Sequence, residues 1–188
     1  MEAIVGSFLL VALGEMGDKT QLLAFSLASR YRKPWVVLLG ILVATLVNHA
    51  LAASVGGLVS QLVPPRLLAA ILAALFIGFG LWTLKPDTLD EDTRPSRFGP
   101  FVTTTVLFFL AEMGDKTQLA TVVLAARYQS VGLVTVGTTL GMMAANVPAV
   151  FLGDKLAAKV QMKWIRWSAA SIFFIFGALS IGAAVRGG

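Results

Sequence analysis

Six long runs of apolar residues, separated by short polar stretches, make up most of this sequence. The runs extend over about residues 3–29, 35–62, 66–84, 98–126, 132–152 and 164–185. An α-helix needs about 20 mainly apolar residues to cross the hydrocarbon core of a bilayer, and each run is close to or above that length. The pattern therefore predicts an all-α membrane protein with six transmembrane helices.

The composition agrees with a membrane location. Hydrophobic residues make up 57% of the 188 residues and charged residues 13%, and the mean hydropathy is +0.82. Soluble domains carry about 25% charged residues, so the charged fraction is well below that of a soluble protein. The chain has no cysteine. Disulfides, thiolate metal sites and cysteine nucleophiles are therefore excluded.

The basic residues lie mainly in the stretches between the apolar runs. Ten of them fall on one predicted side of the membrane: Arg30, Arg32, Lys33, Lys85, Arg94, Arg97, Lys155, Lys159, Lys163 and Arg166. Three fall on the other side: Arg66, Arg127 and Arg186. The positive-inside rule explains this bias and the net charge of +5 better than nucleic-acid binding does. We expect a chain embedded in the lipid bilayer, with no nucleic-acid partner and with both termini outside.

The first apolar run is expected to remain in the protein. Met1–Ala3 precedes it and carries no basic residue, whereas a cleavable signal peptide begins with a basic segment. This start is typical of a multi-pass protein of the bacterial inner (plasma) membrane.

The chain contains one polar motif twice. Glu15–Gln21 reads EMGDKTQ and returns letter for letter as Glu112–Gln118, 97 positions later. The same shift relates further residues outside the motif: Ala28, Arg30, Tyr31, Gly40, Phe79 and Gly80 to Ala125, Arg127, Tyr128, Gly137, Phe176 and Gly177. Each half then holds three spans, and an odd number inverts the second half relative to the first. We predict a first three-helix repeat over 1–84, a cytoplasmic linker over 85–97 and an inverted repeat over 98–188.

Both motifs lie inside apolar runs, where charged residues are costly. A charged side chain at the centre of a bilayer costs about 2.5–3.5 kcal/mol on insertion scales, which indicates a functional reason for keeping it there. On one helix, the glutamate, aspartate and glutamine would be spaced i, i+3 and i+6 and would share a face. Two facing motifs would supply carboxylate and amide oxygens, a donor set for a hard divalent cation such as Mn²⁺, Ca²⁺ or Mg²⁺. The predicted metal ligands are Glu15, Asp18, Gln21, Glu112, Asp115 and Gln118.

The lysines and glycines of the motif modify this picture. Lys19 and Lys116 each follow a motif glutamate by four residues, a favourable spacing for an ion pair within a helix. Four carboxylates and two lysines leave a charge of −2, which one divalent cation or two protons would neutralise. Gly14 and Gly17 weaken a helix around Glu15, and a local break would free backbone carbonyls as further ligands.

The second and fifth runs carry two asparagines and the chain's single histidine. Asn48 and Asn146 are related by the repeat with a slip of one residue, and they suit either a role beside the metal or hydrogen bonding between helices. His49 has no counterpart in the second half and is expected to pack.

The doubled E-x-G-D-K-T motif resembles that of the MneA-type manganese exporters, members of the second calcium:cation antiporter family. The resemblance covers essentially the whole chain. It implies that Glu15, Asp18, Glu112 and Asp115 bind the cation, with Lys19, Thr20, Lys116 and Thr117 as neighbouring motif positions. In the bacterial members it implies Mn²⁺ efflux.

These observations predict a secondary transporter that exports Mn²⁺ in exchange for protons at a site built from both motifs. A Ca²⁺/H⁺ antiporter of the same fold and a passive divalent cation channel are the alternatives. An intramembrane enzyme is disfavoured, because the sequence offers no nucleophile constellation, nucleotide loop or lipid-phosphate motif. No bound cofactor is expected beyond the transported Mn²⁺ or Ca²⁺.

Overall fold

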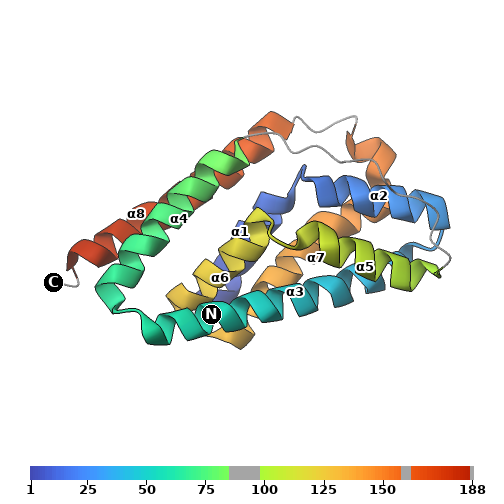
Figure 1. The fold of residues 1–188 in the computed structure, drawn as a ribbon. Coiled ribbons are helices and arrows are strands. Elements are labelled where there is room, and N and C mark those ends of the chain that lie inside the picture. The colour runs from blue at the N-terminus through green and yellow to red at the C-terminus, as the bar shows by residue number, and fades with distance from the viewer. Residues whose placement is uncertain (85–97, 158–161, 187–188) are drawn as a thin grey trace.

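The chain folds entirely into helices in the computed structural model, which describes residues 1–84, 98–157 and 162–186 (Figure 1). This part of the chain forms eight helices: α1 Glu2–Glu15, α2 Lys19–Tyr31, α3 Pro34–Leu62, α4 Pro65–Thr83, α5 Pro100–Glu112, α6 Lys116–Tyr128, α7 Val131–Ala157 and α8 Met162–Arg186. The all-α prediction is confirmed. The linker predicted over 85–97 lies outside the described residues.

Each motif is interrupted by a local break, as the glycines allowed, so the single helix on which its acids would share one face is not formed. The first apolar run is divided into α1 and α2, and the fourth into α5 and α6. Gly17 and Gly114 stand in the two breaks with φ of +81° and +74°, a left-handed conformation that only glycine adopts readily. Gly14, also predicted to weaken the first helix, remains inside α1.

Three helices of the described residues are long and apolar enough to span a membrane: α3, α4 and Val131–Leu152 of α7. Prolines delimit the first two. Pro34 and Pro65 are first residues of α3 and α4, where a missing backbone N–H costs nothing because it would have no intrahelical partner. The helices α1, α2, α5 and α6 have only 13 or 14 residues each. Each is too short to cross a bilayer alone.

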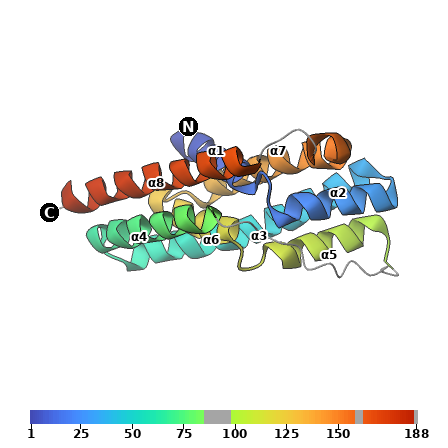
Figure 2. The same ribbon diagram turned by 90° about the horizontal axis from the view of Figure 1, so that it is seen from above.

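The backbone repeats with the sequence. The break between α1 and α2 recurs between α5 and α6. Both α2 and α6 are followed by a left-handed residue, Arg32 with φ of 49° and Gln129 with φ of 50°. Figure 2 shows that α2 and α5 extend towards one end of the molecule, and that α6 and α4 lie towards the other. We refer to the first as the α2/α5 end and to the second, towards which the N-terminal part of α1 also lies, as the α1/α6 end.

The broken helices pack against the two longest helices. α1 lies along α7 and α5 lies along α3, while α3 also contacts α6 and α7 contacts α2. Glycine permits the close approach at two repeat-related places. A Cβ at Gly40 would lie 2.8 Å from Cβ of Thr104, and one at Gly137 would lie 2.9 Å from Cβ of Ser7. The two breaks are thereby held between α3 and α7.

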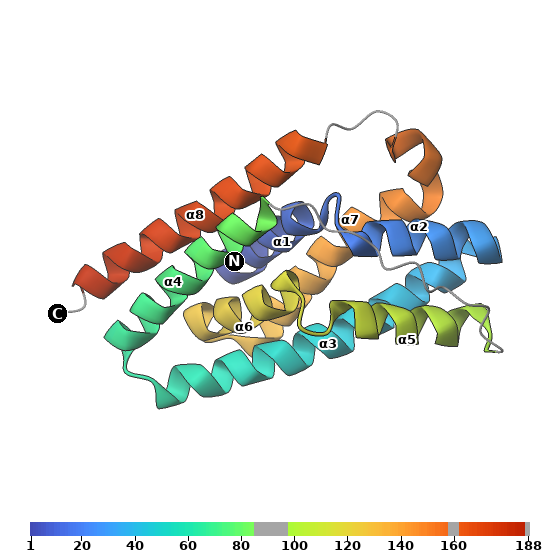
Figure 3. The same cartoon turned by 45° about the horizontal axis from the view of Figure 1, so that its top comes forward.

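Helices α4 and α8 form a separate antiparallel pair beside this core (Figure 3). Aromatic side chains join the pair, with the Phe76 and Phe176 rings 5.3 Å apart and the Phe79 and Phe173 rings 6.0 Å apart. The 97-residue shift relates Phe76 to Phe173 and Phe79 to Phe176, so the two contacts are counterparts of each other.

Candidate metal centre

The two helix breaks bring acidic residues of both motifs together in the interior. Glu15 ends α1, Glu112 ends α5, and Asp115 immediately precedes α6. One carboxylate oxygen of each lies within 4.8 Å of one from each of the others, and all three residues are buried. Three oxygens from two halves of the chain therefore surround one point.

One oxygen of each of these carboxylates is held by a neighbouring side chain. Thr20 Oγ1 donates to Glu15 Oε2 at 2.7 Å, and Thr117 Oγ1 donates to Glu112 Oε2 at 3.1 Å. These two threonines were predicted only as neighbours of the site, and the structure gives each of them a contact with a motif glutamate. Their bonds fix the orientation of both glutamates.

The second oxygen of each carboxylate remains available. Among the described residues, Glu15 Oε1, Glu112 Oε1 and Asp115 Oδ2 are buried and accept no hydrogen bond. A buried carboxylate oxygen without a partner is costly, so native proteins seldom keep one without a ligand, an ion or a water. Three such atoms in one cluster could serve as ligands of one cation.

The lysines pair between the two motifs, and the prediction of ion pairs within each motif is wrong. Lys116 Nζ lies 2.6 Å from Asp18 Oδ1, and Lys19 Nζ lies 3.3 Å from Asp115 Oδ1. The reason is the break, which removes the helical i, i+4 geometry between each glutamate and the lysine of its own motif. The side chain of Lys19 is 29% exposed and that of Lys116 only 4%. The two identical motifs therefore have unequal environments.

The motif glutamines stabilise the breaks. Gln21 Oε1 accepts a hydrogen bond from the Gly17 backbone N–H at 2.9 Å, and Gln118 Oε1 accepts one from Gly114 at 2.7 Å. Each amide thus satisfies a backbone donor that the interrupted helix leaves without a carbonyl. The role of both glutamines as metal ligands stays a prediction.

The glutamines also connect the breaks to α3 and α7. Gln118 Nε2 donates to Asn48 Oδ1 at 2.8 Å, and Asn48 Nδ2 donates to the Phe109 carbonyl at 3.1 Å. Gln21 Nε2 donates instead to the Ala145 carbonyl at 2.7 Å. Ala145 is the residue that the 97-residue shift relates to Asn48. Its role could not be found from the sequence, because a backbone carbonyl leaves no signal in the side-chain pattern.

Asn146 does not take the place of Asn48 in the second half. Its Nδ2 donates to the Met142 carbonyl within α7, and its Oδ1 is buried without a hydrogen bond from the described residues. His49 is likewise buried, and both its ring nitrogens lack a partner there. Neither residue is placed by these contacts in the carboxylate cluster.

Four helix ends meet at the site. The carbonyl ends of α1 and α5 stop at Glu15 and Glu112, and the N–H ends of α2 and α6 begin just after Asp18 and Asp115. A helix N-terminus stabilises a nearby anion and a C-terminus a nearby cation, each by about 0.3–1 kcal/mol when exposed. The aspartates therefore lie where negative charge is favoured, and the carbonyl ends favour a cation.

This arrangement suits a hard divalent cation. Ligand oxygens on opposite sides of a Ca²⁺ ion are about 5 Å apart, and those around a smaller ion are closer, so oxygens within 4.8 Å of one another can share one ion. Oxygen donors without sulfur favour Mg²⁺, Ca²⁺ or Mn²⁺ over softer metals.

A family model matches the chain in both halves. The family is described as divalent cation/proton antiporter GDT1, and the match covers residues 3–91 and 100–187. All the motif residues of the candidate centre fall within these two segments.

Several known proteins are similar over nearly the whole chain. A protein of Vibrio cholerae named "Putative manganese exporter" is 47% identical over 176 residues, covering 93% of this chain and 88% of the relative. A GDT1-like protein of Synechocystis is 30% identical, covering 96% of this chain and 97% of the relative. GDT1-like protein 5 of Arabidopsis thaliana is 29% identical, covering 96% of both. No solved structure matches the chain.

Proposed function

The chain belongs to the GDT1 family of divalent cation/proton antiporters, and from this membership we propose that it exports Mn²⁺ in exchange for protons. It is a multi-pass membrane transporter and not an enzyme. The observation that carries the proposal is the buried cluster of Glu15, Glu112 and Asp115, in which both halves contribute oxygens to one point. A single ion held between the halves is the expected substrate complex.

The charges of the centre support exchange. Glu15, Asp18, Glu112 and Asp115 carry four negative charges when ionised, and Lys19 and Lys116 carry two positive charges. The difference of −2 equals the charge that one Mn²⁺ ion or two protons would neutralise. Because uncompensated charge is expensive in a low-dielectric interior, the cation and the protons would replace one another rather than leave together.

The oxygen donors and the similarity to a protein named as a manganese exporter both favour Mn²⁺. Gln21 and Gln118 would complete the ligand set by turning their amide oxygens from the glycines to the ion. Asp18 would join the ligands when Lys116 moves away.

The proposed membrane arrangement has six spans in two inverted repeats. The pairs α1/α2 and α5/α6 would each cross the bilayer as one broken span, and α3, α4, α7 and α8 would cross as single helices. The repeat-related helices α2 and α6 extend from their breaks towards opposite ends of the molecule, which supports the inversion (Figure 2). The excess of lysine and arginine on one side supports a plasma-membrane protein with both termini outside.

Ion flux in proteoliposomes tests this function. Purified protein should move Mn²⁺ in a direction set by an imposed pH gradient, with proton movement in the opposite direction. Ca²⁺ and Zn²⁺ should compete less well than unlabelled Mn²⁺. Glu112→Gln should abolish the flux, whereas Glu91→Gln, a matched change in the polar stretch between the halves, should retain it.

Three outcomes would contradict the proposal. Mn²⁺ flux that ignores the pH gradient would indicate a passive channel. Preferential transport of Ca²⁺ would change the substrate, and full flux by Glu112→Gln would remove the carboxylate cluster from the mechanism.

A further inference from the structure

The α4–α8 pair packs on only one end of the core. It contacts α6 through α4 and α1 through α8. By the repeat, the contact of α4 with α6 corresponds to a contact of α8 with α2, and the contact of α8 with α1 corresponds to a contact of α4 with α5. Within the described residues, these two corresponding pairs of helices are nearly or wholly out of contact. The pair therefore covers the α1/α6 end and leaves the α2/α5 end uncovered (Figures 1 and 2).

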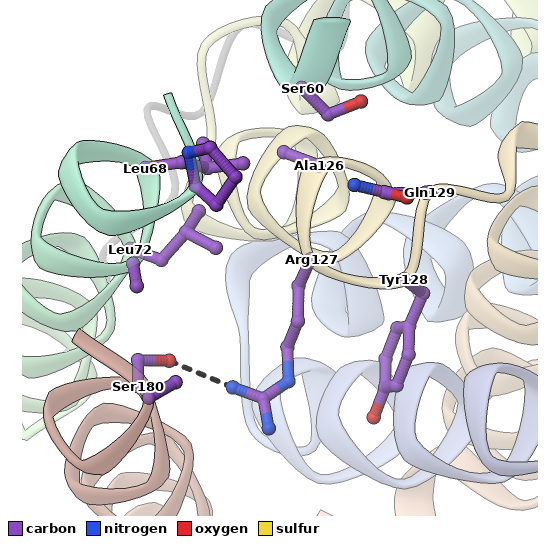
Figure 4. A pocket seen from close by; sticks show the side chains of 11 residues that line it. Ser60, Leu68, Leu72, Ala126, Arg127, Tyr128, Gln129 and Ser180 are labelled. Atoms are coloured by element: carbon purple, nitrogen blue, oxygen red, sulfur yellow. Dashed lines mark hydrogen bonds between the residues drawn. The ribbon is translucent and has the colours of Figure 1, made fainter. Parts of the chain in front are cut away.

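A cluster of side chains, the Arg127 cluster, joins α1, α6 and α8 at the covered end. Arg127 Nη1 donates to Ser180 Oγ at 2.8 Å (Figure 4). The guanidinium also lies 5.2 Å from the centre of the Phe176 ring. A Cβ at Gly6 would lie 2.5 Å from the Tyr128 hydroxyl and 3.3 Å from Phe176. A larger residue at this position would require the tips of the Tyr128 and Phe176 side chains to shift.

The residues that the repeat relates to this cluster are Thr103, Arg30, Tyr31, Phe79 and Thr83. They are not assembled in the same way. Thr83 Oγ1 is buried and has no hydrogen bond with the described residues, although its counterpart Ser180 accepts one from Arg127. Arg30 is exposed, with its guanidinium 5.9 Å from the Tyr31 ring, and Thr103 Oγ1 donates to the carbonyl of Phe98.

The same asymmetry reaches the metal centre. The first motif lies under the pair, since Thr83 lines a small pocket with Asp18 and Lys116. Met113, in the break of the second motif, is 56% exposed, whereas its counterpart Met16 is only partly exposed and lines the same pocket as Thr83. Lys116, which pairs with Asp18 beside this pocket, is 4% exposed, whereas Lys19, which pairs with Asp115, is 29% exposed.

We propose that Arg127 is a positioning residue for transport, which closes the α1/α6 end by holding the α4–α8 pair over it. When the pair turns about the connection between Val63 and Pro64, the related residues around Arg30 and Thr83 close the α2/α5 end. The buried hydroxyl of Thr83 then gains the partner that it lacks in this state. The inference rests on the transport function proposed above, because only a transporter needs to open its binding site to each side of the membrane in turn.

The expected effect of Arg127→Ala is a shift between the two states. An interaction shifts the equilibrium between two states only by the difference in its free energy between them. The loss of a hydrogen bond to a charged group changes an equilibrium by about tenfold or more. Arg127→Ala should therefore favour the state open at the α1/α6 end by about that factor.

Single cysteines can measure the shift, because the chain has no native cysteine. Met113→Cys and Met16→Cys are matched reporters, one in each break. A charged, membrane-impermeant thiol reagent is applied to either face of oriented vesicles. In the parent, the cysteine at 113 should react from the α2/α5 side, and the cysteine at 16 should react slowly from both sides.

Arg127→Ala should slow the reaction at position 113 about tenfold and speed the reaction at position 16 from the α1/α6 side. Arg127→Lys, which keeps a cationic donor, should restore part of the parent pattern. Ser180→Ala should act in the same direction as Arg127→Ala with a smaller effect.

Arg30→Ala should act in the opposite direction and slow the reaction at position 16 further. Arg66→Ala, an exposed arginine near the same end, is the control and should change neither rate.

Unchanged rates in Arg127→Ala, an equal change in Arg66→Ala, or an unreactive cysteine at 113 in the parent would each overturn the inference. The labelling needs no transport, so the two proposals fail separately. A shift in labelling without any Mn²⁺ flux would refute only the proposed function. Normal flux with unshifted labelling would refute only the role of Arg127.

Discussion

At the scale of single residues, each acid of the centre has one carboxylate oxygen in contact with a neighbouring side chain and a second oxygen without a hydrogen bond from the described residues. This division matters because an ion needs ligands whose positions are fixed before it arrives. Thr20 and Thr117 supply that fixation for the two glutamates. The remaining oxygens converge from both halves, so neither motif can form the centre by itself.

Glu15→Gln and Glu112→Gln should each abolish Mn²⁺ flux rather than halve it. Each substitution keeps nearly the same side-chain volume but removes one unit of negative charge from a buried site that must balance +2. Flux in proteoliposomes at matched protein amounts measures the loss, which should exceed tenfold. Two independent half-sites would instead leave each single variant near half activity, with loss only in the double variant.

Lys116→Ala should impair transport and stability more than Lys19→Ala. Removing Lys116 leaves Asp18 buried without this partner, and breaking a buried ion pair costs about 3–5 kcal/mol. Lys19 is partly exposed, where an ion pair is worth about 0–1 kcal/mol. Thermal unfolding in detergent and Mn²⁺ flux together measure the difference. Equal effects of the two variants would show that the unequal burial has no energetic consequence.

Several of these contacts could not be predicted from the sequence. The acids and threonines were identifiable because charged and polar residues stand out in an apolar run. The pairing of Lys19 with Asp115 and of Lys116 with Asp18 was not, since it depends on how the two halves face each other. The i, i+4 spacing pointed instead to pairs within a continuous helix, which the breaks do not permit.

At the scale of helices, the breaks determine what the motif can do. The apolar runs gave the positions of the helices well, because length and hydropathy decide them. The glycines indicated a weak point, yet helix propensity alone could not say that Gly17 and not Gly14 adopts the left-handed conformation. The hydrogen bonds from the backbone N–H groups of Gly17 and Gly114 to the motif glutamines stabilise the break at these glycines.

Gly114→Ala should lower both stability and Mn²⁺ flux although its side-chain position faces open space. The penalty is conformational, because a left-handed backbone costs a non-glycine residue about 1–2 kcal/mol. Gly78→Ala is the matched control, since Gly78 lies within α4 and also faces open space. Alanine there should leave stability unchanged or raise it. Unfolding temperature and flux of both variants test the comparison, and equal behaviour would refute a requirement for the break.

At the scale of the whole molecule, the two halves contain the same kinds of helices. The α4–α8 pair nevertheless packs mainly against one end of the core. The sequence indicates the repeat directly through the doubled motif. It could not indicate which end the α4–α8 pair covers, because related residues such as Ser180 and Thr83 offer similar hydroxyls to both ends. That choice depends on the packing of the pair against the core.

The proposed orientation predicts that residue 96 faces the cytoplasm. A Ser96→Cys variant in intact cells should resist a membrane-impermeant thiol reagent and should react once the membrane is opened. Leu67→Cys, in the exposed first turn of α4, is the control for the outer side and should react without permeabilisation. Labelling of position 96 from outside would reverse the orientation.

The reciprocal pairing of lysines and aspartates has a consequence for biosynthesis. When the ribosome has delivered the first half of the chain to the membrane, Asp18 is already in place but Lys116 has not yet been translated. The nascent half therefore carries an acid whose counter-charge arrives only with the second half. A fragment of residues 1–84 produced alone should be degraded rapidly, and co-expression of residues 98–188 should protect it, as pulse-chase labelling can measure. Rapid degradation of the fragment even when both halves are co-expressed would show that the pairing does not protect the first half.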